Sequence, residues 1–113
     1  MYVLVSYVPE SHLEQVKNAL FQAGAGAIGN YSCCSWQVKG QGQFKPEAGS
    51  TPFLGGQGQV ERVEEYRLEL VCPQEKLHEV AAALKGAHPY EEPAYHFIHA
   101  VTIDDCCLKF DVI

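Results

Sequence analysis

The chain repeats its own pattern at a constant offset of 64 residues, and this repeat restricts the folds open to it. Residues 2–31 align with residues 66–95 without a gap. Nine positions are identical, most of them on one face of an expected helix or at the start of an expected strand. In the first segment they are Tyr2, Leu4, Pro9, Leu13, Val16, Ala19, Leu20, Ala23 and Tyr31. We therefore expect two copies of one strand–helix–strand unit.

Hydrophobic spacing places the elements within each unit. In the first unit, apolar residues recur at helical intervals and predict a helix over residues 10–23. Residues 31–38 are rich in β-forming side chains and predict the returning strand. In the second unit, residues 63–72 alternate between apolar and charged side chains, which predicts a half-buried strand. Pro9 and Pro73 each precede a helix start, where a missing N–H does no harm.

Two strand–helix–strand units in tandem predict an α+β fold, a ferredoxin-like double βαβ sandwich. Right-handed crossovers put both helices on one face of an antiparallel sheet. We expect residues 1–113 to form this single domain. The other face then has no helices, yet Val3, Val5 and Tyr7 would point toward it. Apolar residues on both faces of a strand predict burial of both faces, and hence self-association.

Gly24, Gly26 and Gly29 match the pattern G-x-G-x-x-G, which is typical of dinucleotide-binding turns. That function requires the glycines to follow a strand and open a helix, whereas here they follow a helix and precede a strand. We therefore interpret Gly24 as a helix C-cap and the others as a tight crossing. Beside Gly29, Asn30 is expected to tolerate a left-handed conformation. Gly26, Gly29 and Asn30 remain candidate ligand-binding residues.

Residues 39–59 contain six glycines and two prolines and separate the two units. A loop of this length without structure is unusual in a compact domain. It predicts a glycine-rich hairpin or an oligomer arm, with a ligand-binding loop as the alternative. For the ligand-binding alternative, Gly40 and Gly42 are the candidate residues. The last residues, 106–113, alternate weakly and predict a short edge strand.

The densest polar cluster is His88, Tyr90, Glu91 and Glu92, directly after the second expected helix. Imidazole and carboxylates in one turn suit a divalent metal, with His88, Glu91 and Glu92 as ligands, and they also suit acid–base chemistry. Tyr90 is a candidate ligand-binding residue. The alternative is a structural turn fixed by two prolines, with the charges solvated and His88 complementing the helix dipole.

Composition narrows the functional classes. The formal net charge is −6 with eight scattered basic residues, which argues against nucleic acid as a partner. The apolar start has no basic region and runs into Pro9, so we expect no signal peptide, no membrane partner and a cytoplasmic protein. Five cysteines without a C-x-x-C spacing predict free thiols in a reducing compartment. A nucleophilic role for Cys33 or Cys34 would require a nearby base.

The segments 19–35, 40–46, 52–61, 64–69 and 88–95, the last reading H-P-Y-E-E-P-A-Y, together resemble one family pattern. It is the domain inserted in many bacterial members of the NGG-interacting-factor-three-like family (YqfO-type proteins), which is similar in fold to PII signalling proteins and CutA divalent-ion-tolerance proteins. The resemblance implies a stand-alone version of the insert and a trimer. It does not transfer the dinuclear metal site of the full-length proteins, whose ligands lie in the flanking halves.

The sequence thus predicts a non-enzymatic, homo-oligomeric binding or regulatory module of PII/CutA type. It would bind a small ligand or a divalent metal ion where loops of neighbouring subunits meet, and that metal ion is the one candidate cofactor. One alternative is a small enzyme that uses Glu91 or Glu92 as a base, or a cysteine as nucleophile. A second alternative is a pure protein-interaction domain.

Overall fold

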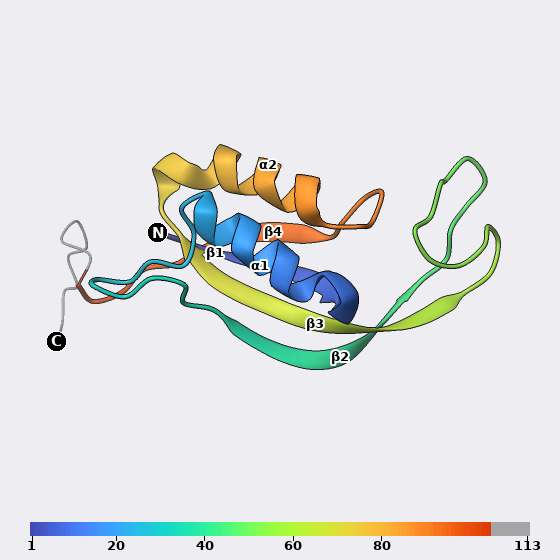
Figure 1. Cartoon of the computed structure of the whole chain (residues 1–113), viewed down its shortest axis with the longest axis horizontal. Coiled ribbons are helices and arrows are strands. Elements are labelled where there is room, and N and C mark those ends of the chain that lie inside the picture. Colours follow the sequence, from blue (N-terminus) through green and yellow to red (C-terminus); the bar gives the residue numbers. More distant parts are fainter. Residues whose placement is uncertain (105–113) are drawn as a thin grey trace, which may run out of the picture.

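The computed structural model of the protein describes residues 1–104 and shows a four-stranded sheet with two helices on one face (Figure 1). In chain order the elements are β1 (Tyr2–Pro9), the 3-10 turn η1 (Glu10–His12), α1 (Leu13–Gln22), β2 (Trp36–Phe44), β3 (Glu61–Cys72), the 3-10 turn η2 (Gln74–Lys76), α2 (Leu77–Ala87) and β4 (Tyr95–His99). The strand order is β2-β3-β1-β4, and every neighbouring pair is antiparallel. The predicted ferredoxin-like arrangement is confirmed, whereas the predicted tail strand lies outside the described residues.

The repeated residues form the core between the sheet and the helices. From the central strands, Leu4, Val8, Leu68, Leu70 and Cys72 point toward the helices. From the helices, Val16, Leu20, Val80 and Leu84 are fully buried against them. Full burial of such side chains stabilises the fold by about 1.5–3 kcal/mol each. The sequence repeats at these positions because both units fill the same layer.

Helix α1 ends where the glycine pattern predicted. The N–H of Gly24 donates to the carbonyl of Phe21, and the N–H of Ala25 donates to that of Leu20. Gly24 has a φ of +112°. This pair of bonds is the Schellman motif, which terminates a helix with a left-handed residue. The C-cap interpretation of Gly24 is confirmed.

The predicted strand over residues 31–38 is wrong in its first five residues. Ile28 and Tyr31 exchange two backbone hydrogen bonds, so that Gly29 and Asn30 form a tight two-residue turn. Gly29 has a φ of +56°, and among the described non-glycine residues only Cys33 has a positive φ, so the left-handed conformation expected of Asn30 is not found. Of the expected strand, the turn includes only Tyr31, and residues 32–35 belong to no strand. Strand β2 begins at Trp36 and continues into the glycine-rich segment, so the β2–β3 hairpin has its loop at residues 45–60.

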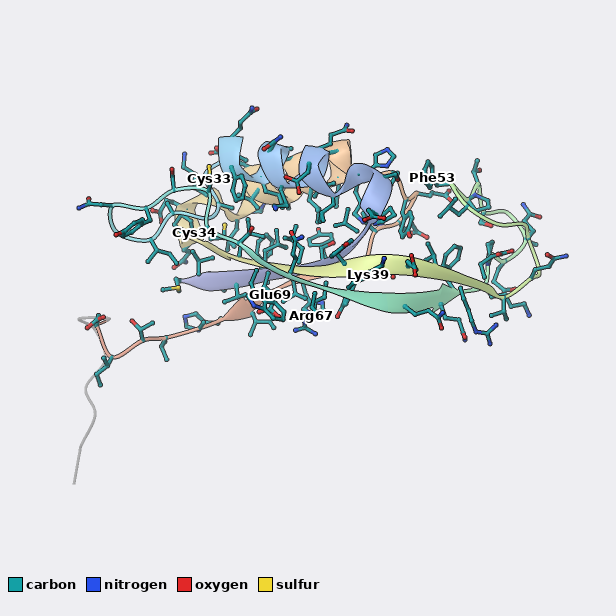
Figure 2. All side chains as sticks on the ribbon, turned by 60° about the horizontal axis from the view of Figure 1, so that its bottom comes forward. Cys33, Cys34, Lys39, Phe53, Arg67 and Glu69 are labelled. Carbon is teal, nitrogen blue, oxygen red and sulfur yellow. The ribbon has the colours of Figure 1, made fainter. Side chains whose placement is uncertain are left out.

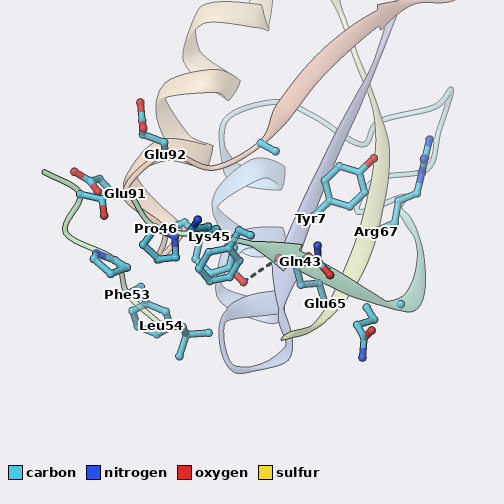
Figure 3. Close-up of a pocket in the computed structure, with 18 of the residues that line it drawn as sticks. Tyr7, Gln43, Lys45, Pro46, Phe53, Leu54, Glu65, Arg67, Glu91 and Glu92 are labelled. Atoms are coloured by element: carbon cyan, nitrogen blue, oxygen red, sulfur yellow. Dashed lines mark hydrogen bonds between the residues drawn. The ribbon is translucent and has the colours of Figure 1, made fainter. Parts of the chain in front are cut away.

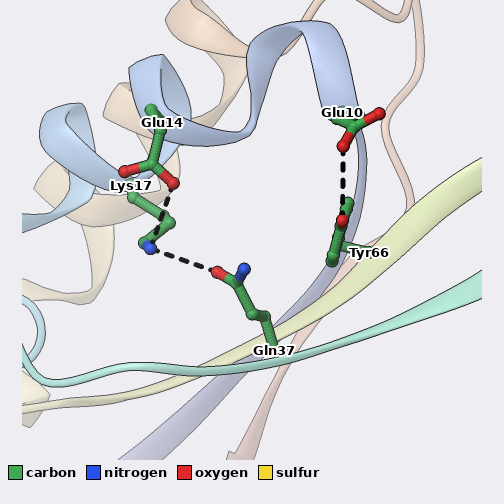
Figure 4. Close-up of polar contacts among 5 residues, drawn as sticks. All are labelled: Glu10, Glu14, Lys17, Gln37 and Tyr66. Atoms are coloured by element: carbon green, nitrogen blue, oxygen red, sulfur yellow. Dashed lines mark hydrogen bonds and ion pairs between the residues drawn. The ribbon is translucent and has the colours of Figure 1, made fainter.

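Polar side chains fasten the first helical segment to the sheet (Figure 4). Nζ of Lys17 in α1 lies 3.2 Å from the Glu14 carboxylate and donates to Oε1 of Gln37 in β2 at 3.1 Å. The Tyr66 hydroxyl of β3 lies 3.4 Å from Glu10. These contacts connect η1 and α1 to the outer half of the sheet. Neither helix of the described residues is long and apolar enough to cross a bilayer.

The face of the sheet without helices, called the open face below, carries both apolar and charged side chains, with Arg67 and Glu69 among the charged ones (Figure 2). Its central residue Val5 is 1% exposed, while Trp36, Val38 and Ile98 are 58%, 45% and 47% exposed. Arg67 and Glu69 on β3 form an ion pair at 2.9 Å on this face. The strand registers also place Glu65 of β3 and His96 of β4 there. The prediction that β1 carries apolar residues on both faces is confirmed.

Candidate functional site

A cavity of about 530 Å³ lies on the outer part of the β2–β3 hairpin (Figure 3). Its walls come from four segments: the hairpin strands, the loop at residues 45–60, the turn at residues 88–94, and strand β1 through Tyr7. The apolar lining residues are Tyr7, Val38, Phe44, Pro46, Pro52, Phe53, Leu54, Tyr90 and Ala94, and the charged ones are Lys45, Glu65, Arg67, Glu91 and Glu92. The volume is in the range of small-molecule sites. We call this space the hairpin cavity.

A carboxylate is held in place inside the hairpin cavity. The Tyr90 hydroxyl donates a hydrogen bond of 2.9 Å to Oε2 of Glu65. Burial raises the pKa of Tyr90, and the bond to Glu65 and the charge of Glu65 raise it further. The hydroxyl therefore remains a donor throughout the physiological pH range. Among residues 1–104, Oε1 of Glu65 accepts no hydrogen bond, and it points toward Gly42, where a Cβ atom would overlap with it.

Tyr90 is itself positioned by His88, which is 5% exposed. The backbone N–H of Tyr90 donates to Nδ1 of His88 at 3.2 Å, so Nδ1 is the acceptor nitrogen. Nε2 then carries the proton and donates to the carbonyl of Tyr7 at 2.7 Å. Burial lowers the pKa of His88, while the bond to Tyr7 and the charge of Glu65 oppose that shift. His88 is therefore a neutral residue that links the turn to β1.

Aromatic rings surround the Tyr90 hydroxyphenyl group. The ring of Phe44, at the end of β2, has its centroid 6.0 Å from that of Tyr90. The ring of Phe53, in the loop, lies 6.3 Å from Tyr90 and 5.4 Å from His12. Tilted and edge contacts at these separations are favourable for aromatic side chains. Through Phe53, the loop therefore packs against residues of the main domain.

One polar contact also connects the loop to the turn. The backbone N–H of Thr51 donates to Oε1 of Glu91 at 2.8 Å. The contact is exposed to solvent, so it contributes less than a buried bond of the same length. It joins the loop, next to the lining residues Ser50 and Pro52, to Glu91, which also lines the cavity.

The structure divides the predicted site residues into two groups. The hairpin cavity is lined by one group, Gly40, Gly42, Tyr90, Glu91 and Glu92. His88 does not line the cavity but accepts a hydrogen bond from the backbone of Tyr90. Gly26, Gly29 and Asn30 lie in the loop at the opposite end of the sheet, where the Gly26 N–H donates to the carbonyl of Val71. These three residues are not brought together with the others.

The three predicted metal ligands do not converge. Both ring nitrogens of His88 are used in hydrogen bonds, and Glu91 accepts a bond from the loop. Within residues 1–104 there is no group of three His, Cys, Asp or Glu side chains arranged to hold a metal ion. A metal at His88 would have to displace one of its bonds, so metal binding stays a prediction.

Among the cavity residues that sequence reasoning missed are Phe44, Phe53, Glu65 and Arg67. The sequence carried a recognisable signal only for the two aromatic residues. Glu65 and Arg67 occupy outward positions of an alternating strand, where charged residues are ordinary, so their role depends on what lies opposite. Phe44 and Phe53 are aromatic residues within a glycine-rich segment, and such large side chains in a loop indicate that it packs against something.

Comparison with known proteins places the chain among relatives that are much longer. No protein-family model matches the chain. A GTP cyclohydrolase 1 type 2 homolog of Halalkalibacterium halodurans is 52% identical over 95 residues, which is 84% of this chain and 26% of the relative. The chain thus spans about a quarter of the length of the curated relatives it matches.

Solved structures agree with that homology. A Bacillus cereus protein related to NIF3 matches with a TM-score of 0.74 and 44% identity, over 86% of this chain and 24% of the other. CutA1 from Pyrococcus horikoshii matches with a TM-score of 0.67 and 17% identity, over 94% and 89% of the two chains. The predicted resemblance to the NIF3-related segment and to the CutA-like fold is confirmed.

Proposed function

Because this chain is homologous to a segment of the GTP cyclohydrolase 1 type 2 homologs and has a CutA-like fold, we propose that it is a non-enzymatic, homo-oligomeric binding module of PII/CutA type. One observation carries the proposal: the hairpin cavity and the open face share residues. Tyr7, Val38 and Arg67 line the cavity and also lie side by side across the sheet. A subunit that covers the open face would therefore reach the cavity.

The open face suits a second copy of the chain. Trp36, Val38 and Ile98 are large, exposed apolar side chains on one surface, and soluble proteins usually cover such surfaces. Arg67 and Glu69 neutralise each other, so a covering subunit would bury this pair without a net charge. The Glu65 carboxylate on the same face lines the hairpin cavity and is bonded to the Tyr90 hydroxyl. Burial of this face requires no change in the helices, which lie on the other side. The resemblance to PII and CutA makes a trimer the expected assembly.

The assembly is tested by native mass spectrometry and by light scattering after size-exclusion chromatography. The wild-type protein is expected at three times the subunit mass. Val38→Asp, on the open face, is expected to shift it to monomers, because an unpaired carboxylate would be buried in the interface. Val60→Asp is the matched control, since Val60 has nearly the same exposure, 48% against 45%, but lies outside the sheet. A wild-type monomer at tens of micromolar would contradict the proposed oligomer.

The binding role has its own measurement. Amide resonances of Gly40 and Gly42 in two-dimensional NMR spectra report on the cavity wall, and those of Gly26 and Gly29 report on the far end of the sheet. A small ligand of this module is expected to shift the first pair and leave the second pair unchanged. Spectra with added Zn²⁺ test the predicted divalent ion at His88, Glu91 and Glu92. A ligand that shifts only the second pair would place the site at the other end.

A further inference from the structure

We propose that the hairpin cavity is built for an organic cation, with the carboxylate of Glu65 pairing with the positive charge. This inference rests on the proposed binding function and goes beyond it by naming the chemical class of the ligand. The ligand would carry one ammonium or amidinium group on an aromatic or aliphatic body. Three features of the cavity support it: the held carboxylate, the rings beside it, and the balance of charge.

The carboxylate is prepared for a charged partner before the ligand arrives. The Tyr90 hydroxyl holds Oε2 of Glu65, and the chain of bonds from Tyr90 through His88 to the carbonyl of Tyr7 holds Tyr90. Oε1 accepts no hydrogen bond from residues 1–104, and the absence of a side chain at Gly42 leaves it room. A fixed acceptor with a free oxygen binds a cation at little cost in side-chain entropy.

The rings favour a cation over a neutral polar group. Phe44 and Phe53 both contact Tyr90, with centroids at 6.0 and 6.3 Å. The faces of aromatic rings attract ammonium groups, particularly where water is partly excluded. The apolar residues Pro46 and Leu54 extend the wall and would contact the body of the ligand.

The charges of the cavity disfavour an anion. Three carboxylates line it, from Glu65, Glu91 and Glu92, against two basic side chains. Of the basic pair, Arg67 is already paired with Glu69, which leaves Lys45. A bare metal ion is also a poor fit, because residues 1–104 contain no group of three ligating side chains. A cation with an apolar body uses both the charge and the volume of about 530 Å³.

Three probes of nearly equal size test the charge: benzyltrimethylammonium, the neutral phenylmethanesulfonamide and the anionic phenylmethanesulfonate. Each is titrated into the full-length chain, with affinity measured by calorimetry and location by the amide shifts of Gly40 and Gly42. The cation is expected to bind most tightly. Glu65→Gln is expected to weaken its binding about tenfold, because the variant loses the attraction between the carboxylate charge and the quaternary ammonium in a partly buried site. Gln can still accept the Tyr90 hydroxyl, so the cavity wall is retained.

Glu64→Gln is the matched control. Glu64 is the neighbouring residue on β3 but lies on the helix side, pairs with Lys39 at 3.3 Å and is not part of the cavity wall. It changes the net charge of the protein by the same amount, and the cation should bind this variant as it binds the wild type.

The outcomes separate the two proposals. If the anion or the neutral probe binds at the cavity as tightly as the cation, the cavity is a binding site but the cation assignment is wrong. If the cation binds at the cavity but Glu65→Gln and Glu64→Gln lower its affinity equally, the Glu65 carboxylate is not its partner. If none of the three probes shifts Gly40 or Gly42, the binding function at this cavity fails as well.

Discussion

Replacing Gly26 by alanine is expected to destabilise the domain far more than replacing Gly29, although both glycines have a positive φ. Gly26 has a φ of +79° and Gly29 a φ of +56°, so each alanine would be held in a conformation that costs about 1–2 kcal/mol. Removing a glycine also restricts the unfolded chain, which returns about 0.4–1 kcal/mol. The net cost at Gly29 is therefore about 1 kcal/mol or less, because a Cβ atom there meets nothing within 4 Å.

At Gly26 a second cost is added. A Cβ atom would lie 2.7 Å from the carbonyl oxygen of Cys34 and 2.9 Å from the ring of Phe21. This oxygen belongs to the backbone and cannot rotate away as a side chain could. The N–H of Cys34 also donates to the carbonyl of Gly26 at 2.8 Å, so the two segments are held together. Overpacking of this kind costs about 1–3 kcal/mol. Together these costs predict that Gly26→Ala lowers the free energy of unfolding by about 3 kcal/mol. This loss is at least about three times the loss expected for Gly29→Ala.

Thermal unfolding followed by circular dichroism measures the difference. For a domain of this size, 1 kcal/mol corresponds to about 4–8 °C in Tm. Gly26→Ala is therefore expected to lower Tm by more than about 10 °C, and Gly29→Ala by less than about 8 °C. Both variants and the wild type must be compared at one protein concentration, because the proposed assembly would stabilise the folded state. Equal losses of Tm in the two variants would show that conformational cost alone decides, and that the close approach to Cys34 has no role.

Two further predictions concern the hairpin cavity. Gly42→Ala is expected to displace the Glu65 carboxylate, and so to weaken the binding of benzyltrimethylammonium about as much as Glu65→Gln does. A Cβ atom at Gly40 meets nothing within 4 Å, so Gly40→Ala should leave the affinity measured by calorimetry unchanged. Unfolding by urea is expected to become easier as the pH falls below 6.5, the ordinary pKa of histidine. The folded-state pKa of His88 is lowered, so the unfolded chain takes up the proton first and stability is lost by at most about 1.4 kcal/mol per pH unit. His88→Asn should flatten that dependence, and an unchanged slope would contradict the role assigned to His88.

The repeat predicted most of the fold because its identical residues are core residues. Leu4 and Leu68, or Leu20 and Leu84, are required by the same layer of packing, and periodicity makes that requirement visible in the sequence. The error at residues 31–35 has a different origin. Tyr31 matches Tyr95, which begins β4, but the turn at Gly29 and Asn30 delays β2 to Trp36. Turn geometry depends on single backbone conformations, which a repeat in side chains does not record.

The candidate site could be predicted only in part. Tyr90, Glu91 and Glu92 were identified because they stand close together in the sequence, and the hairpin segment was identified by its glycines. Glu65 was missed because its partner Tyr90 is 25 residues away and belongs to a different segment. His88 was assigned to a metal because histidine is a common ligand, whereas its two nitrogens are used to position Tyr90. Contacts between distant segments decide these roles.

The chain enters and leaves this domain at one point. Tyr2 of β1 pairs with His99 of β4, their rings are 5.0 Å apart, and the N–H of Ala100 donates to the carbonyl of Met1 at 3.0 Å. A host protein could therefore carry the whole domain between two neighbouring residues of its own chain. Because the two ends of the domain are close together, these host residues would stay near each other in space. Such a domain can be gained, lost or moved between proteins without rebuilding either fold. The hairpin cavity would remain outside the host, because the loop at residues 45–60 lies at the other end of the sheet from the joint (Figure 1).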